Sequence, residues 1–167
     1  MVTNLHQNKN MAEEIKPIIK KEVKRDYVYA VFRRKEAIAR VRLYSHIKEG
    51  LLWGDQVITK DQIIVNGKPI EHYFPGPIAK ALYMQPFIIT NTLNKYGVSI
   101  KVESGGRSGQ LDAMVHGIAK ALSLVDRVKF RKLLKAKGLL TRDPRVRERR
   151  KVGTGGKARR KKQSPKR

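Results

Sequence analysis

The clearest pattern in this sequence lies in SGGRSGQLDAMVHGIAKALSLVDRVKFRKLLKAKG, residues 104–138. Within it, apolar residues recur at intervals of three and four, which predicts one stripe of an amphipathic helix. The stripe consists of Leu111, Met114, Val115, Ile118, Leu122 and Val125. Ser108 can cap the start of this helix. The side away from the stripe is expected to carry Asp112, His116, Lys120, Ser123 and Arg127.

Elements on either side of this helix are also readable. Asp126 can cap a last helix that runs to Lys137, with Gly138 just past its end. On the other side, residues 97–103 alternate between apolar and polar positions, which predicts a strand. The loop from Ser104 to Gln110 then connects that strand to the helix. Its glycines suit either a tight turn or the backbone cradle of an RNA phosphate, with Arg107 beside it.

Residues 27–44 have the pattern of extended chain, interrupted at 33–35 by Arg-Arg-Lys, where we expect a bulge or bend. Beyond the interruption, Arg40 and Arg42 alternate with Val41 and Leu43, so the two pairs should face opposite sides of a sheet. A sheet with one apolar and one basic face is a plausible platform for RNA.

The middle of the chain predicts shorter elements. Residues 45–61 suggest a loop or a loosely paired hairpin, and 62–65 a strand ended by the turn signal Asn66-Gly67. A short helical turn at 69–74 precedes a break at Pro75-Gly76-Pro77. Residues 78–85 are helical in pattern, and Pro86 either starts a new turn or kinks the helix. Strands and helices without strict alternation indicate an α+β fold.

Charge divides the chain into three parts. Its 167 residues include 38 Lys and Arg against 14 Asp and Glu, a formal net charge of +24. The last 27 residues alone hold 13 basic and 2 acidic side chains, and they lack aromatic residues. We therefore expect a flexible extension at 1–26, a globular body at 27–140 and an extended basic tail at 141–167. The tail is either an arm along nucleic-acid phosphates or a solubilising or nuclear-targeting segment.

Several kinds of chemistry are disfavoured by the sequence. There are no cysteines, and the four histidines are scattered without metal-ligand spacing. No nucleophile elbow is present. No apolar run reaches the roughly 20 residues of a membrane-spanning helix. We therefore expect no enzyme activity, no cofactor, no metal, no small-molecule substrate and no membrane partner.

Four motifs in order resemble the family of the ninth small-subunit ribosomal protein of bacteria and organelles. They are RRKEAIARVRL at 33–43, VNGKPIEHYFP at 65–75, SGGRSGQLDAMVHGIAKAL at 104–122 and LLTRDPRVRERRKVG at 139–153. The chain departs from the family pattern at Ser104, where glycine is usual, and at Val115, where arginine is common. It also departs at Pro165, near the tail tip, and in the extra length of residues 45–61.

The resemblance implies a small four-stranded sheet packed by helices, similar to domain two of the fifth small-subunit protein, with a basic C-terminal tail. It implies a structural constituent of the ribosome, located in the cytoplasm, that binds rRNA in the head of the small subunit beside neighbouring head proteins. The tail would reach P-site tRNA through Lys166 and Arg167. The expected rRNA contacts are Arg33, Arg34, Lys35, Arg40, Arg42, Arg107, Lys120, Arg142, Arg145, Arg147, Arg149, Arg150, Lys151, Lys157, Arg159, Arg160, Lys161 and Lys162. A free-standing nucleic-acid chaperone of the same fold is the alternative.

Overall fold

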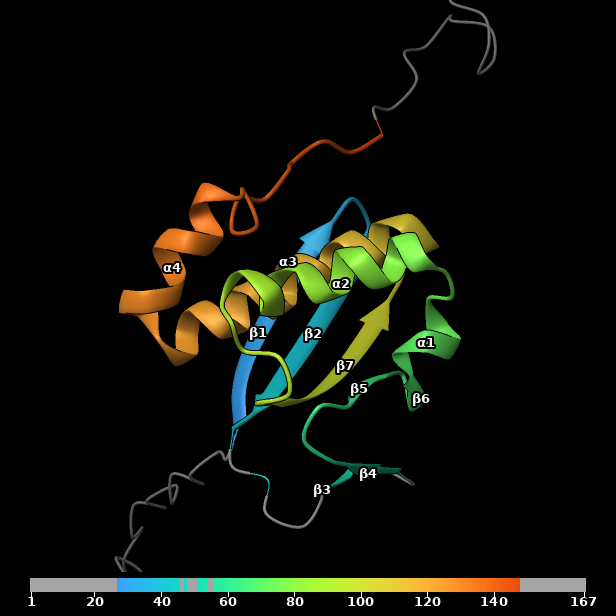
Figure 1. Ribbon diagram of the computed structural model, residues 1–167. Coiled ribbons are helices and arrows are strands. Elements are labelled where there is room, and N and C mark those ends of the chain that lie inside the picture. Colours follow the sequence, from blue (N-terminus) through green and yellow to red (C-terminus); the bar gives the residue numbers. More distant parts are fainter. Residues whose placement is uncertain (1–26, 46, 48–50, 54–55, 148–167) are drawn as a thin grey trace, which may run out of the picture.

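Two long strands, β1 (Tyr27–Arg34) and β2 (Ala37–Tyr44), form a hairpin at one side of the molecule (Figure 1). The computed structural model describes residues 27–45, 47, 51–53 and 56–147. Of the expected bulge or bend at 33–35, the bulge is wrong, because the pairing is regular up to Arg34 and Ala37 and the chain reverses in a two-residue turn between them. Lys35 takes a positive φ of 52°, as the first residue of such tight turns does. The basic run therefore sits at the tip of a hairpin.

The main sheet has five strands in the order β1-β2-β7-β5-β6. Strand β7 (Gly97–Glu103) lies antiparallel to β2 and parallel to β5 (Ile63–Val65), so the sheet is mixed. A sheet of four strands was expected. The fifth is the two-residue β6 (Lys68–Pro69), which pairs back onto β5 because Asn66 and Gly67 both adopt positive φ in the turn between them.

A separate hairpin of β3 (Leu51–Trp53) and β4 (Gln56–Ile58) confirms the paired alternative for residues 45–61. Ile47 and Ile58 from this segment are buried against Tyr44 and Ile64, in a small second core. Gly97 permits this approach, since a Cβ there would lie 2.4 Å from Ile47 Cδ1. Ile47 and Ile58 thus pack on the sheet face opposite the long helices.

Helices α2 (Pro77–Ile89) and α3 (Arg107–Val125) lie together on one face of the sheet (Figure 1). The short α1 (Ile70–Tyr73) precedes them, as the sequence predicted. Pro86 lies inside α2, which continues to Ile89, so it does not start a separate helix. No helix in the described parts of the chain is long and apolar enough to cross a membrane.

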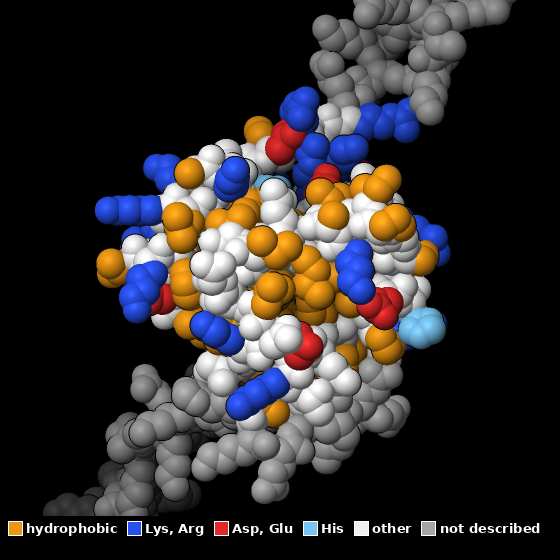
Figure 2. Space-filling view, viewed as in Figure 1, with side chains coloured by type: hydrophobic (Ala, Val, Ile, Leu, Met, Phe, Trp, Pro, Cys, Tyr) orange, Lys and Arg blue, Asp and Glu red, His pale blue; other side chains and the backbone are white. Residues whose placement is uncertain are grey.

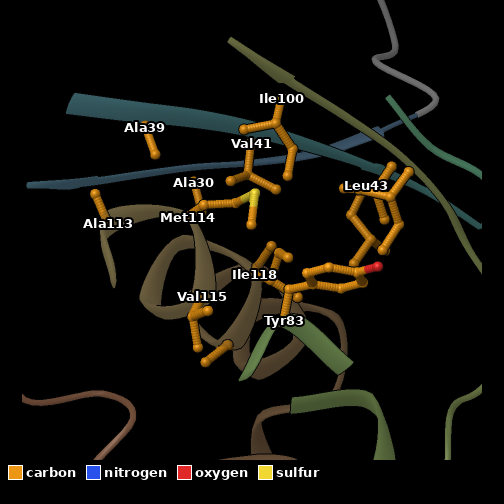
Figure 3. Close-up of a cluster of buried hydrophobic side chains, with 14 of the residues drawn as sticks. Ala30, Ala39, Val41, Leu43, Tyr83, Ile100, Ala113, Met114, Val115 and Ile118 are labelled. Carbon is orange, nitrogen blue, oxygen red and sulfur yellow. The ribbon is translucent and has the colours of Figure 1, made fainter. Parts of the chain in front are cut away.

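The main core lies between α3 and the sheet (Figure 3). Val41 and Ile100 of the sheet face Met114 and Ile118 of α3, while Tyr83 of α2 closes one end. The predicted apolar stripe is confirmed, since four of its six residues are buried and the other two are partly buried. Helix and strand come unusually close at Gly117, where a Cβ would lie 2.8 Å from Val41 Cγ2.

The helix start and its polar side differ from expectation. Gly106, not Ser108, occupies the cap position of α3, because the positive φ values of Ser104 and Gly105 turn the chain before Arg107. Ser123 is buried rather than exposed. The reason is tertiary: α4 (Arg127–Ala136) and the segment after it pack against that side of α3.

The end of the body follows the sequence closely. Asp126 caps α4 by accepting a hydrogen bond from the backbone N–H of Lys129 at 3.0 Å. Gly138 takes a positive φ of 71° just after the helix, as predicted. The chain then leaves the body at the end that carries the β1–β2 turn, as Figure 1 shows.

Candidate nucleic-acid interface

Basic side chains collect where β1, α3, α4 and the segment after α4 meet. Figure 2 shows Lys and Arg side chains gathered beside the point where the described chain ends. A groove of about 410 Å³ lies among these elements, and we call it the β1–α4 groove. It is lined by Val31, Phe32, Arg33, Lys120, Ser123, Arg131, Leu140 and Arg142. Four of these residues are cations, and none is acidic.

The structure therefore brings together three predicted contacts that lie far apart in the sequence, Arg33, Lys120 and Arg142. Lys120 also donates a hydrogen bond from Nζ to the carbonyl of Val31 at 3.2 Å. This bond spans from α3 to the edge strand β1 and holds the Lys120 ammonium at the groove.

A neighbouring ion-pair network holds the start of the C-terminal segment. Arg34, only 15% exposed, lies between two carboxylates: its Nη1 is 3.0 Å from Asp143 Oδ2, and its Nε is 3.5 Å from Asp112 Oδ2. Arg34 Nη1 is buried with no well-aligned hydrogen-bond acceptor, so the attraction there is one of charge. Arg145 donates two hydrogen bonds to the same Asp143 Oδ2, from Nε at 2.9 Å and from Nη2 at 2.6 Å.

His116 connects α3 to strand β1, through Phe32, and to the segment after α4. The two rings stack with centroids 4.8 Å apart, and His116 Nδ1 lies 2.6 Å from the carbonyl oxygen of Leu139. Since both contacts tie α3 to its surroundings, His116 is a packing and hydrogen-bonding residue. In the part of the chain that the structure describes, no group of acidic and histidine side chains could hold a metal ion.

The remaining predicted contacts are spread over other surfaces. Lys35 is exposed at the β1–β2 turn, and Arg107 is exposed at the start of α3, whose first turn packs on that hairpin end. Arg147 is exposed near the end of the described chain. The ten predicted cations from 149 onward, including Lys166 and Arg167, lie outside the described residues.

Arg40 and Arg42 occupy the sheet face away from the helices, as alternation predicted. Arg40 donates to Glu103 at 2.6 Å, and Lys101 lies 3.1 Å from the same carboxylate. These two cations, Lys101 first, lower the pKa of Glu103. Arg42 lies over the ring of Tyr27 at 5.2 Å. This face is therefore basic, and part of its positive charge is already paired with Glu103.

Comparison with known proteins decides the family. The family model described as ribosomal protein S9/S16 matches residues 32–167. The small ribosomal subunit protein uS9 of Maridesulfovibrio salexigens is 43% identical over 132 residues, which are 79% of this chain and 91% of the relative. The protein of the same name from Lawsonia intracellularis is 42% identical over 128 residues, 77% of this chain and 88% of the relative.

The chain belongs to the ribosomal protein S9/S16 family. Membership confirms the expected structural role in the small ribosomal subunit, and with it the expectation that the protein is not an enzyme. The α+β architecture with a mixed sheet is consistent with the S9/S16 assignment.

Sequence reasoning missed Arg131 as a candidate contact of this S9/S16 member. Arg127, Arg131 and Lys135 recur every four residues on α4, so a cationic helix side was visible in the sequence. Which of them faces the groove depends on how α4 lies against β1, and this is set by tertiary packing.

Replacing Asp143 by alanine is expected to loosen residues 141–145 of the S9/S16 chain. Hydrogen bonds from the Arg145 side chain and backbone, together with the charge of Arg34, hold the pKa of Asp143 well below its ordinary value. The stability that this network contributes to the folded protein should therefore be fully present above about pH 4, the pKa of an unfolded aspartate, and be lost progressively as the pH falls below that value. Amide hydrogen exchange of Arg145, whose N–H donates to Asp143 Oδ1 at 2.9 Å, should accelerate about fivefold in the variant.

The matched control is Glu71→Ala, which removes an exposed ion pair with Lys80 at 3.0 Å elsewhere on the body. It should leave exchange at Arg145 unchanged. Equal exchange at Arg145 in Asp143→Ala and the unmodified protein would contradict the role given to this network.

Proposed function

We propose that this protein binds small-subunit rRNA in the head of the ribosome, among neighbouring head proteins, and touches P-site tRNA through Lys166 and Arg167. One observation carries the proposal: in a chain of the S9/S16 family, residues 141–167 hold 13 Lys and Arg against 2 acidic residues. Such an excess repels itself unless a polyanion neutralises it.

The proposed parts have separate tasks. Residues 27–140 form a body that docks on rRNA, with the fold of domain two of the fifth small-subunit protein. Residues 141–167 form an arm that enters crevices of folded rRNA, and residues 1–26 are an extension. Binding through phosphates is independent of sequence, which a site that accepts every tRNA requires.

Deleting Lys166 and Arg167 tests the tRNA contact. Subunit assembly should stay intact, because the tail retains its other 11 Lys and Arg, from Arg142 to Lys162. P-site tRNA affinity should fall about tenfold, the effect of two exposed phosphate contacts worth somewhat under ~1 kcal/mol each. Filter binding of tRNA to reconstituted subunits measures this.

A charge-matched control replaces Lys161 and Lys162 by glutamine and keeps the last two residues. It should leave tRNA affinity nearly unchanged. If both variants lost the same affinity, the effect would belong to total charge, and the specific role of Lys166 and Arg167 would be withdrawn.

Sedimentation provides the test of rRNA binding: the protein should pellet with small subunits after a high-salt wash.

A further inference from the structure

The β1–α4 groove differs from the other basic surfaces in how its cations are supplied. Arg33 comes from β1, Lys120 from α3, Arg131 from α4 and Arg142 from the segment that follows α4. Its volume of about 410 Å³ falls within the range of pockets that hold small molecules. Four cations from four separate elements converge there only because the chain is folded.

The acidic residues nearby are already engaged with other arginines. Asp112 and Asp143 pair with Arg34, and Asp143 also pairs with Arg145. Across residues 27–147, excepting the undescribed gaps, no carboxylate lies within 4.0 Å of the side-chain nitrogens of the four groove cations. Within the described residues, the groove thus keeps its positive charge uncompensated by carboxylates.

The ion-pair network also sorts neighbouring arginines into two groups. Arg33 and Arg34 are adjacent in β1, yet Arg33 is exposed at the groove while Arg34 is half-buried between carboxylates. Arg145 is held back on Asp143, whereas Arg142, three residues earlier, lines the groove. Fixing residue 143 against β1 therefore places Arg142 beside Arg33.

We infer that the β1–α4 groove binds the phosphodiester backbone of one rRNA strand, and that Arg131 contacts it, while Arg34 and Arg145 position Arg142 rather than contact RNA. This inference rests on the proposed function. Like charges brought together without a carboxylate are stabilised by a polyanion, and Arg and Lys are the side chains that bind phosphate oxygens. The strand would run beside the point where the basic tail leaves the body.

The test compares two arginines of the same helix in the full-length protein. Arg131→Gln removes a groove cation, and Arg127→Gln removes an exposed cation four residues earlier, outside the groove. Affinity for small-subunit rRNA is measured as a function of salt. One lost phosphate contact makes the slope of log K against log salt shallower by about 0.9, which is roughly fivefold in affinity at 0.15 M salt.

Arg131→Gln should show this loss and Arg127→Gln less than about twofold. A triple change of Arg33, Lys120 and Arg131 to glutamine should lose roughly 100-fold. Equal effects of the two single changes, with the unmodified protein binding rRNA tightly, would overturn the groove assignment alone. Failure of the unmodified protein to bind rRNA would overturn the proposed function itself. Circular dichroism melting identifies a variant that has lost its fold. If a groove variant has lost its fold, the single change Arg142→Gln, which lies outside all helices and strands, is tested in its place under the same criteria.

Discussion

Removal of residues 148–167 is expected to weaken binding to small-subunit rRNA by about 10³-fold at 0.15 M salt. The removed segment holds ten Lys and Arg against one Glu. If half of these cations neutralise a phosphate each, the slope of log K against log salt becomes shallower by about 4. The body should keep its fold, because the core residues lie between Ala30 and Leu139. Affinity measured from about 0.05 to 0.3 M salt checks both the loss and the slope.

A tail of scrambled order separates charge from sequence. It keeps the composition of residues 148–167 but not their arrangement, and the electrostatic part of binding should survive in it. If the truncated protein bound as tightly as the full chain, the arm would not carry the affinity. If the scrambled tail bound as weakly as the truncated protein, ordered contacts rather than charge would dominate.

Local signals predicted the elements whose causes are local. Residues 97–103 form a strand with the expected bounds, Asp126 caps α4, and Asn66-Gly67 closes a hairpin. In each case a few adjacent residues determine the backbone, through side-chain alternation, a capping carboxylate or a turn that needs positive φ. The same reasoning held for the buried stripe of α3.

The features that escaped prediction depend on contacts between distant residues. Arg33 and Arg34 look alike in the sequence, and only the positions of Asp112 and Asp143 separate a groove cation from one that is paired with carboxylates. Arg131 reaches the groove because α4 packs against α3. Ser123 is buried for the same reason. Charge composition therefore predicted the kind of partner, while tertiary packing decides which cations are available to it.

Replacing Ile118 by alanine is expected to lower the free energy of unfolding by about 2–5 kcal/mol. Ile118 is fully buried in the middle of α3, at the contact of that helix with the sheet (Figure 3). Truncation removes buried methyl groups and leaves a cavity. Because α3 and β2 are already in close contact at Gly117, the helix cannot move closer to the sheet to fill that cavity. Urea unfolding followed by circular dichroism measures the change.

Leu124→Ala is the matched control, since Leu124 lies on the same helix with 54% of its surface exposed. Its unfolding free energy should change by less than about 0.5 kcal/mol, because little apolar area is returned to water. A small effect at Ile118 would mean that α3 does not carry the core. The groove would then lose its basis as well, because Lys120, two residues along the same helix, is held at the groove only while α3 packs on the sheet.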